Sequence, residues 1–188
     1  MKSTGSARKS TSTTPSQKRA GKAFESEFAK SLESFRETRN PHFWWKRWPD
    51  YRDFIAINRH LFAPRAPADF TSIYRGTTYF WELKSTRGTR YVFDWIKEHQ
   101  KDTLLALELA GARAYLVFEH RVRPMRCTVI PISEYICYES IWESGGKKSV
   151  PIDVLMSTGI PLERDGVGWN ISEILEDEKN DREAKRES

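Results

Sequence analysis

The spacing of apolar residues predicts helices in three parts of the chain. Between residue 22 and about residue 37, large apolar side chains recur at helical spacing and form one stripe. The residues of that stripe are Phe24, Phe28, Leu32 and Phe35. A leucine-rich helix is expected over residues 97–110, closed by Gly111, and a short amphipathic helix over residues 133–142.

Alternating and β-branched stretches predict strands between these helices. Residues 67–84 have β-branched and aromatic residues on both sides of Arg75-Gly76, which is typical of a β-hairpin with a two-residue turn. Residues 114–119 and 125–130 indicate two further strands, and one helical turn is expected over residues 153–156. Helices that alternate with strands place the fold in the α/β class.

The hairpin register brings chemically useful residues together. If Arg75 and Gly76 form the turn, counting outward places Asp69 opposite Glu82, with Cβ atoms roughly 4.5–5.5 Å apart. Lys84 lies two residues beyond Glu82, so it shares the same face of the strand. Facing carboxylates repel each other unless a divalent cation lies between them, and Mg²⁺ favours such oxygen ligands. The alternative is a solvated hairpin face with a Glu/Lys pair.

Other residues could join this group. Glu25 lies on the flank of the first helical stripe, from which a carboxylate could reach toward the hairpin as a third acid. His99 and Gln100 open the leucine-rich helix and could face the metal side, although we interpret His99 as structural. Arg87 and Arg90, in the loop after Lys84, could clamp phosphates.

Residues 40–66 combine aromatic rings with cations, and Pro41, Pro49 and Pro64 interrupt any regular structure. Such a surface can stack on exposed bases and hold the DNA backbone. The predicted DNA-binding residues here are Trp44, Trp45, Lys46 and Arg47. We favour a projecting element with a packed base and a DNA-facing rim, and the alternative is a small satellite core.

Length and charge limit the remaining possibilities. The 188 residues suit one domain, expected over residues 21–175, between a disordered basic arm at 1–20 and a charged tail at 176–188. The arm is either a non-specific phosphate binder or an inert tail. A net charge of +5 permits a polyanionic partner. Cys127 and Cys137 lack metal-site spacing and are expected to be buried thiols.

Several function classes are excluded by what the sequence lacks. No apolar run approaches the roughly 20 residues that span a bilayer, and the basic N-terminus has no apolar signal region, so we expect a cytoplasmic protein and no membrane partner. The glycine- and lysine-rich residues 145–149 do not have the Walker spacing, so no nucleotide cofactor is expected.

Four sequence elements, in order, resemble the motifs of the PD-(D/E)xK nucleases, and most of all the Holliday-junction resolvases of Gram-positive bacteria and their archaeal and phage relatives. These elements are Gly21-Lys-Ala-Phe-Glu25, Pro67-Ala-Asp69, Glu82-Leu-Lys84 and His99-Gln100. The resemblance covers about residues 21–155 and implies a mixed β-sheet flanked by helices, working as a two-fold dimer.

The resemblance also assigns roles to residues. It implies that Glu25, Asp69 and Glu82 are metal ligands, that Lys84 is the catalytic lysine, and that Gln100 is a polar residue at the edge of the site. Residues 40–66 take the place of a projecting stalk, but their tryptophan content departs from the family pattern. Pro67-Ala68 replaces the hydroxyl-rich residues that precede the aspartate in the bacterial branch.

The resulting interpretation is a Mg²⁺-dependent endonuclease, with Mn²⁺ as a substitute, that makes paired cuts in four-way DNA junctions as a homodimer. The alternatives are a restriction- or repair-type nuclease on the same core, and a DNA-binding module without turnover. Leucines on two sides of residues 100–110 suggest that one side meets a partner chain. The other explanation for them is burial beneath the helix at 133–142.

Overall fold

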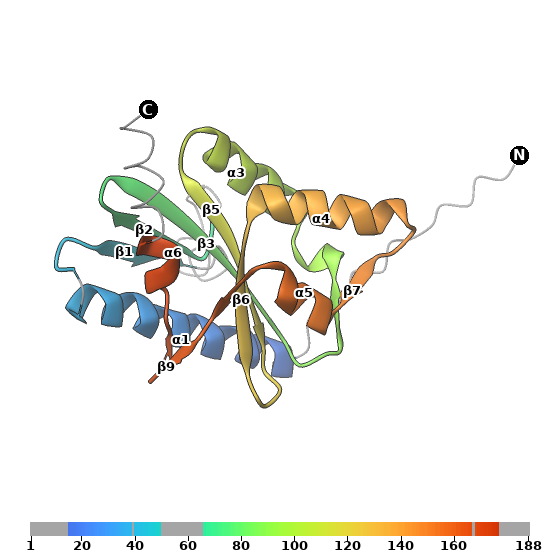
Figure 1. The fold of residues 1–188 in the computed structure, drawn as a ribbon, viewed down its shortest axis with the longest axis horizontal. Helices are drawn as coiled ribbons and strands as arrows, with labels where there is room; N and C mark the ends of the chain where they lie inside the picture. Colours follow the sequence, from blue (N-terminus) through green and yellow to red (C-terminus); the bar gives the residue numbers. More distant parts are fainter. Residues whose placement is uncertain (1–14, 39, 50–65, 167, 177–188) are drawn as a thin grey trace, which may run out of the picture.

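The computed structural model describes residues 15–38, 40–49, 66–166 and 168–176. Six strands form the main sheet, in the order β1-β2-β3-β5-β6-β8 (Figure 1). Their bounds are β1 Trp44–Arg47, β2 Phe70–Tyr74, β3 Thr77–Thr86, β5 Arg113–His120, β6 Arg126–Pro131 and β8 Ile160–Leu162. Because β3 and β5 pair in parallel and the other neighbours are antiparallel, the sheet is mixed.

Helices cover both faces of this sheet. Helix α1, Pro15–Thr38, lies along one face, and α3, Glu98–Leu109, and α4, Ile132–Ser144, lie along the other (Figure 1). A shorter helix, α5, Ile152–Thr158, joins the second face. The predicted α/β class with a mixed sheet between helices is therefore confirmed.

Small elements complete the fold. Strands β4, Arg90–Val92, and β7, Ser149–Pro151, pair with each other, as do β9, Arg164–Asp165, and β10, Gly168–Trp169. A 3-10 helix, η1, spans Phe93–Trp95, and helix α6 spans Ser172–Glu176. None of the paired short strands was predicted from the sequence. In the part of the chain that the structure describes, no helix is long and apolar enough to cross a bilayer.

Side chains along β3 point alternately to the two faces of the sheet, and each face has its own hydrophobic core. Tyr79, Trp81 and Leu83 point toward α1, whereas Phe80 packs with α3 and α4. Glu82, between Trp81 and Leu83, therefore lies on the α3 side of the sheet. The strand thus separates an aromatic core beneath α1 from the face that carries the predicted acidic residues.

The hairpin has the predicted turn. Arg75 and Gly76 have φ angles of 48° and 80°, so both occupy the left-handed region that a two-residue type I′ turn requires. Tyr74 pairs with Thr77 and Phe70 with Trp81, which is the predicted register. One more step outward places Asp69 beside Glu82.

The helices differ from their predictions mainly at the ends. The stripe of α1 is buried as expected, but the helix begins at Pro15, inside the predicted arm at 1–20. At the other end of the chain, α6 was not among the predicted helices. Its Ile174 and Leu175 are buried in the α1-side core, within the predicted domain limit at residue 175. The remainder of both predicted tails lies outside the described residues.

The second apolar side of α3 is partly covered within the chain. Leu104 is buried, Leu105 and Leu107 pack partly against the same core, and only Leu109 is almost fully exposed, at 81%. Helix α4 packs beside α3, and Lys101 Nζ lies 2.8 Å from Glu139 Oε2. Helix α4 therefore covers part of this side, as the alternative explanation expected, and a contact with a partner chain stays a prediction.

The two cysteines are free, and they differ in exposure. Cys127 is buried as predicted, but Cys137 is exposed, so the prediction of two buried thiols is wrong for Cys137. Cys137 lies on α4, at a position that faces away from the neighbouring helix and strands.

An ion-pair network fastens the start of α1 to the end of β5. Arg121 donates to Glu27 Oε1 at 2.8 Å and to the Ala20 carbonyl at 2.9 Å, and it lies 3.3 Å from Glu119 Oε2. Glu119 is buried, and among the described residues neither of its carboxylate oxygens has a hydrogen-bond partner. Burial raises the pKa of Glu119 to about 7, although the Arg121 guanidinium acts in the opposite direction.

This buried acid should make stability depend on pH. Between its ordinary pKa of 4.5 and about pH 7, the folded chain keeps a proton that the unfolded chain has lost. The free energy of unfolding should therefore fall as the pH rises through that window. Glu119→Gln should flatten this fall in urea unfolding measured from pH 5 to pH 8, whereas Glu134→Gln, at an exposed position on α4, should not. An unchanged slope in Glu119→Gln would contradict the assignment.

Candidate active site

The candidate site lies just before the first residue of β2, where β3 continues beyond its pairing with β2. The last ladder pair is Phe70 with Trp81, and beyond it the Asp69 carboxylate replaces a backbone carbonyl. Its Oδ2 accepts the N–H of Leu83 at 2.7 Å, while its backbone carbonyl accepts the N–H of Trp48 at 2.9 Å. Asp69 is therefore held between β1 and β3, next to Glu82.

Glu82 is the buried centre of the site, with 3% of its surface exposed. Its Oε1 accepts hydrogen bonds from Lys84 Nζ and from Gln100 Nε2, each at 2.5 Å. A buried carboxylate needs such charge-assisted partners, because an unpaired one would lose its hydration without compensation. The structure therefore brings together Asp69, Glu82, Lys84 and Gln100, all from the sequence prediction.

Gln100 is itself fixed at the start of α3. Its Oε1 accepts the backbone N–H of Lys97 at 3.1 Å, as part of a capping box. One end of the amide thus closes the first turn of α3, and the other end binds Glu82. His99, the neighbouring residue, is exposed and makes none of the described contacts to the carboxylates.

The pKa values of Asp69 and Lys84 are shifted because two carboxylates and an ammonium lie close together and away from solvent. Burial, and then repulsion by Glu82, raise the pKa of Asp69 to about 8, although Lys84 acts in the opposite direction. Burial would lower the pKa of Lys84, but the carboxylates of Glu82 and Asp69 outweigh it, and the net shift is upward. The lysine therefore stays an ammonium, and the acid pair favours an additional positive charge.

Glu25 does not join the other acids directly. Its carboxylate accepts a hydrogen bond from Arg47 of β1, on the α1 side of the sheet. Glu25 is near enough to add to the repulsion that acts on Asp69. Within the described ranges, however, no three His, Cys, Asp or Glu side chains form a ready-made metal cluster.

The donor set nevertheless fits a hard divalent cation. Mg²⁺ usually takes one or two protein carboxylates and completes its shell with water and substrate phosphate. The hydrogen bonds above use Oδ2 of Asp69 and Oε1 of Glu82, which leaves Oδ1 and Oε2 outside them. The adjacent acids can therefore supply two oxygen ligands without breaking the bonds that position them.

The predicted DNA-binding residues are distributed over different surfaces. In β1, Trp45 packs toward α1 and donates to Glu33 Oε2 at 3.0 Å, while Trp44 is 48% exposed. In the loop after β3, Arg87 is exposed. Arg90, the first residue of β4, donates to Oγ and to the carbonyl of Ser149, both at 2.9 Å. DNA contact by these residues stays a prediction.

Residues 40–49 contain both a packed part and an exposed part. Phe43 is buried against Phe35 and Tyr74, and β1 adds an edge strand to the main sheet. The base of the predicted projecting element is therefore a strand of the sheet. Residues 50–65 lie outside the described residues.

Two residues near the acids were not selected from the sequence as site residues. Thr71 lies two positions after Asp69 on the same strand face, and its Oγ1 accepts a hydrogen bond from Trp48 Nε1 at 2.8 Å. Strand alternation from Asp69 would have identified Thr71. Trp48 could not be placed without the pairing of β1 with β2.

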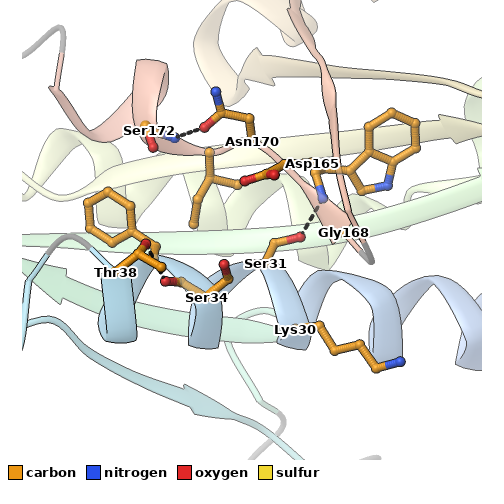
Figure 2. Close-up of a pocket in the computed structure, with 11 residues that line it drawn as sticks. Lys30, Ser31, Ser34, Thr38, Asp165, Gly168, Asn170 and Ser172 are labelled. Atoms are coloured by element: carbon orange, nitrogen blue, oxygen red, sulfur yellow. Dashed lines mark hydrogen bonds between the residues drawn. The ribbon is translucent and has the colours of Figure 1, made fainter.

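A pocket lies elsewhere, between the second half of α1 and the segment from Asp165 to Ser172 (Figure 2). Ser31 Oγ accepts the backbone N–H of Trp169 at 2.7 Å, so the pocket marks where the C-terminal segment docks on α1. Gly168 permits this approach, because a Cβ there would lie 2.4 Å from Ser31 Oγ. The pocket is on the face opposite Glu82, and we assign it no part in the site.

Comparisons with known proteins found a matching family model and a similar solved structure. The family model RecU, described as recombination protein U, matches residues 21–169, and no curated protein matches the chain. Among solved structures, the chain is similar to Hjc, a Holliday junction resolvase from the archaeal hyperthermophile Archaeoglobus fulgidus. The identity is 15%, the match covers 74% of this chain and 94% of that chain, and the TM-score is 0.45.

Removing the amide of Gln100 tests how Glu82 is held. Gln100→Glu keeps an acceptor for the Lys97 N–H but replaces the donor to Glu82 with a second negative charge. The free energy of unfolding should fall by about 1.5–3 kcal/mol, which is typical for a hydrogen bond to a charged group. His99→Glu adds the same charge one residue away at an exposed position and should change stability by less than about 0.5 kcal/mol in urea unfolding. Equal effects of both variants would contradict the described geometry.

Proposed function

The chain belongs to the recombination protein U (RecU) family of Holliday-junction resolvases, and from this membership we propose that Asp69, Glu82 and Lys84 are the centre with which it cuts DNA. It is an endonuclease that resolves four-way junctions. The observation that carries the proposed centre is the buried Glu82 carboxylate, which lies beside Asp69 and binds both Lys84 and Gln100.

Asp69 and Glu82 would hold the metal, with Mg²⁺ as the preferred ion and Mn²⁺ as its substitute. Bound there, such an ion would activate water and stabilise the negative charge that develops on phosphorus. The chain's own groups prepare this place. Asp69 is fixed by the Leu83 N–H, and Glu82 by Lys84 and Gln100, so neither carboxylate must reorganise.

Lys84 has a separate role from the acids. Its ammonium lies 2.5 Å from Glu82 Oε1 and is largely buried. If Glu82 holds the metal, the ammonium would lie next to the scissile phosphate. There it can stabilise negative charge and orient the attacking water. Gln100 is a positioning residue that acts through Glu82. Glu25 is proposed as an outer acid whose pairing with Arg47 competes with metal binding.

The proposed assembly is a homodimer in the cytoplasm, acting on branched DNA. A four-way junction has near two-fold symmetry, and its resolution requires two nicks. One centre in each chain supplies one nick, so two chains related by a two-fold axis are the simplest arrangement. Since α4 packs beside α3 within the chain, Leu109 is the one leucine of that helix that remains almost fully exposed for such a contact.

The acid pair gives the first test of this function. Asp69→Asn and Glu82→Gln should each lower Mg²⁺-dependent cleavage of a four-way junction by more than about 100-fold, because charge stabilisation at phosphorus is lost. Junction affinity in Ca²⁺ should change little. Glu134→Gln, which removes an exposed acid from α4, should cleave like the parent. Substantial cleavage by either site variant would refute the centre, and equal cleavage of junction and plain duplex would indicate a restriction- or repair-type nuclease.

Mixed dimers test the assembly. A dimer that combines one parent chain with one Asp69→Asn chain should nick a four-way junction once and fail to resolve it. The measurement compares nicked and resolved products on denaturing and native gels, after sedimentation has established the oligomeric state at micromolar protein. A monomer that still makes paired cuts would rule out this arrangement.

A further inference from the structure

The pairing of β1 with β2 assigns its four residues to opposite faces of the sheet. Trp45 and Arg47 face α1: Trp45 donates to Glu33 and its ring lies 6.1 Å from that of Phe70, while Arg47 binds Glu25. Trp44 and Lys46 alternate with them and point to the other face. That face also carries Glu82, so only half of the strand is directed toward the acid site.

Three rows of side chains lead across this face toward the acids. Trp44, Ile73 and Thr78 are register partners in the row farthest from the site. Lys46, Thr71 and Phe80 form the next row, and Asp69 and Glu82 follow. Since each row is two residues further along the strands, the first row lies roughly 13 Å from the acids.

The first row is exposed apolar surface. Trp44 is 48% exposed and its cross-strand partner Ile73 is 41% exposed. Among the described residues, helices α3 and α4 pack over the β5 and β6 side of this face and not over β1. Lys46 provides a cation between the apolar pair and the acids, with its Nζ 4.5 Å from the centre of the Trp48 ring. We name Trp44, Lys46 and Ile73 the edge platform.

We propose that the edge platform binds the DNA strand that leads to the scissile phosphate, with an unstacked base on Trp44 and Ile73 and a phosphate at Lys46. This inference rests on the proposed function for the direction of the strand. An exposed indole is a sequence-tolerant stacking surface, and an adjacent cation holds the backbone. The platform is continuous with the acid site along one sheet face, as a strand bound at both places requires.

Its size and charge favour DNA over a second copy of the chain. A stable protein interface buries about 1,200–2,000 Å² in total, far more than two half-exposed side chains offer. The platform also contains a lysine on a chain of net charge +5, which repels an identical surface and attracts phosphate. Trp45, predicted from the sequence as a DNA contact, is excluded from the platform because it packs toward α1.

Binding of a fluorescein-labelled four-way junction to the full-length chain in Ca²⁺ tests the base contact. Trp44→Ala should weaken binding by about 5- to 150-fold, which corresponds to the loss of one stacked base. Trp44→Phe should retain most of the affinity, and Trp44→Leu should not. Ile141→Ala, which removes a 65% exposed apolar side chain from α4, should bind within twofold of the parent. A Trp44→Ala affinity within twofold of the parent, or equal affinities of the Phe and Leu variants, would overturn the proposal.

The phosphate contact has its own readout. Lys46→Gln should reduce the slope of log K against log[salt] by about 0.9, the contribution of one phosphate contact on B-DNA. A slope identical to that of the parent would overturn this part. Sedimentation of Trp44→Ala is the check on the rival occupant. If the variant dissociates a dimer of the parent, the surface is a contact between copies and the proposal fails.

Failure of this inference can be told apart from failure of the proposed function. If the parent resolves junctions and Trp44→Ala binds them normally, the function stands and the platform is wrong. If the parent fails to cut but Trp44→Ala still loses affinity, the platform stands and the centre is wrong. When both hold, Ile141→Ala, which changes neither the platform nor the acid site, should bind and cut the junction like the parent.

Discussion

The hydrogen bond from the Leu83 N–H to Asp69 Oδ2 is the interaction on which the site depends. Strand β3 has ten residues and β2 has five, so β3 continues past the point where β2 can pair with it. A buried N–H without a partner would cost about 1–3 kcal/mol, and the aspartate supplies the missing acceptor. The same bond fixes the carboxylate next to Glu82. One hydrogen bond therefore both satisfies a buried backbone N–H of β3 and positions the Asp69 carboxylate next to Glu82.

The path of the chain explains why Gln100 reaches this place. Parallel strands β3 and β5 require a crossover, and the helix in that crossover returns over one face of the sheet. Helix α3 consequently starts near the end of β3, and its first turn lies over Glu82. The capping bond with Lys97 then sets the orientation of the amide. Gln100, which caps the start of α3, thus also donates a hydrogen bond to Glu82, eighteen positions earlier in the chain.

Local patterns in the sequence predicted the parts of the site that depend on local geometry. The register of the hairpin followed from the turn at Arg75-Gly76, and it placed Asp69 beside Glu82 with Lys84 on the same face. The stripe of α1 followed from helical spacing. The pairing of Glu25 with Arg47 could not be predicted, because it depends on β1, a four-residue edge strand with no alternating pattern. Because β1 was not predicted, the sequence also did not show which of Trp44 and Trp45 faces the acids.

The edge of the sheet shows how the fold separates stability from recognition. Toward α1, the side chains of β1 and β2 join a continuous aromatic core, so changes there affect folding. On the opposite face, α3 and α4 pack over β5 and β6 and, among the described residues, not over β1. Exposed apolar groups at that edge contribute little to folding, and the lysine beside them also discourages edge-to-edge pairing of strands. Trp44, Lys46 and Ile73 therefore contribute little to stability, and they lie on the same face as the acids. Their side chains can serve ligand binding without a cost to the fold.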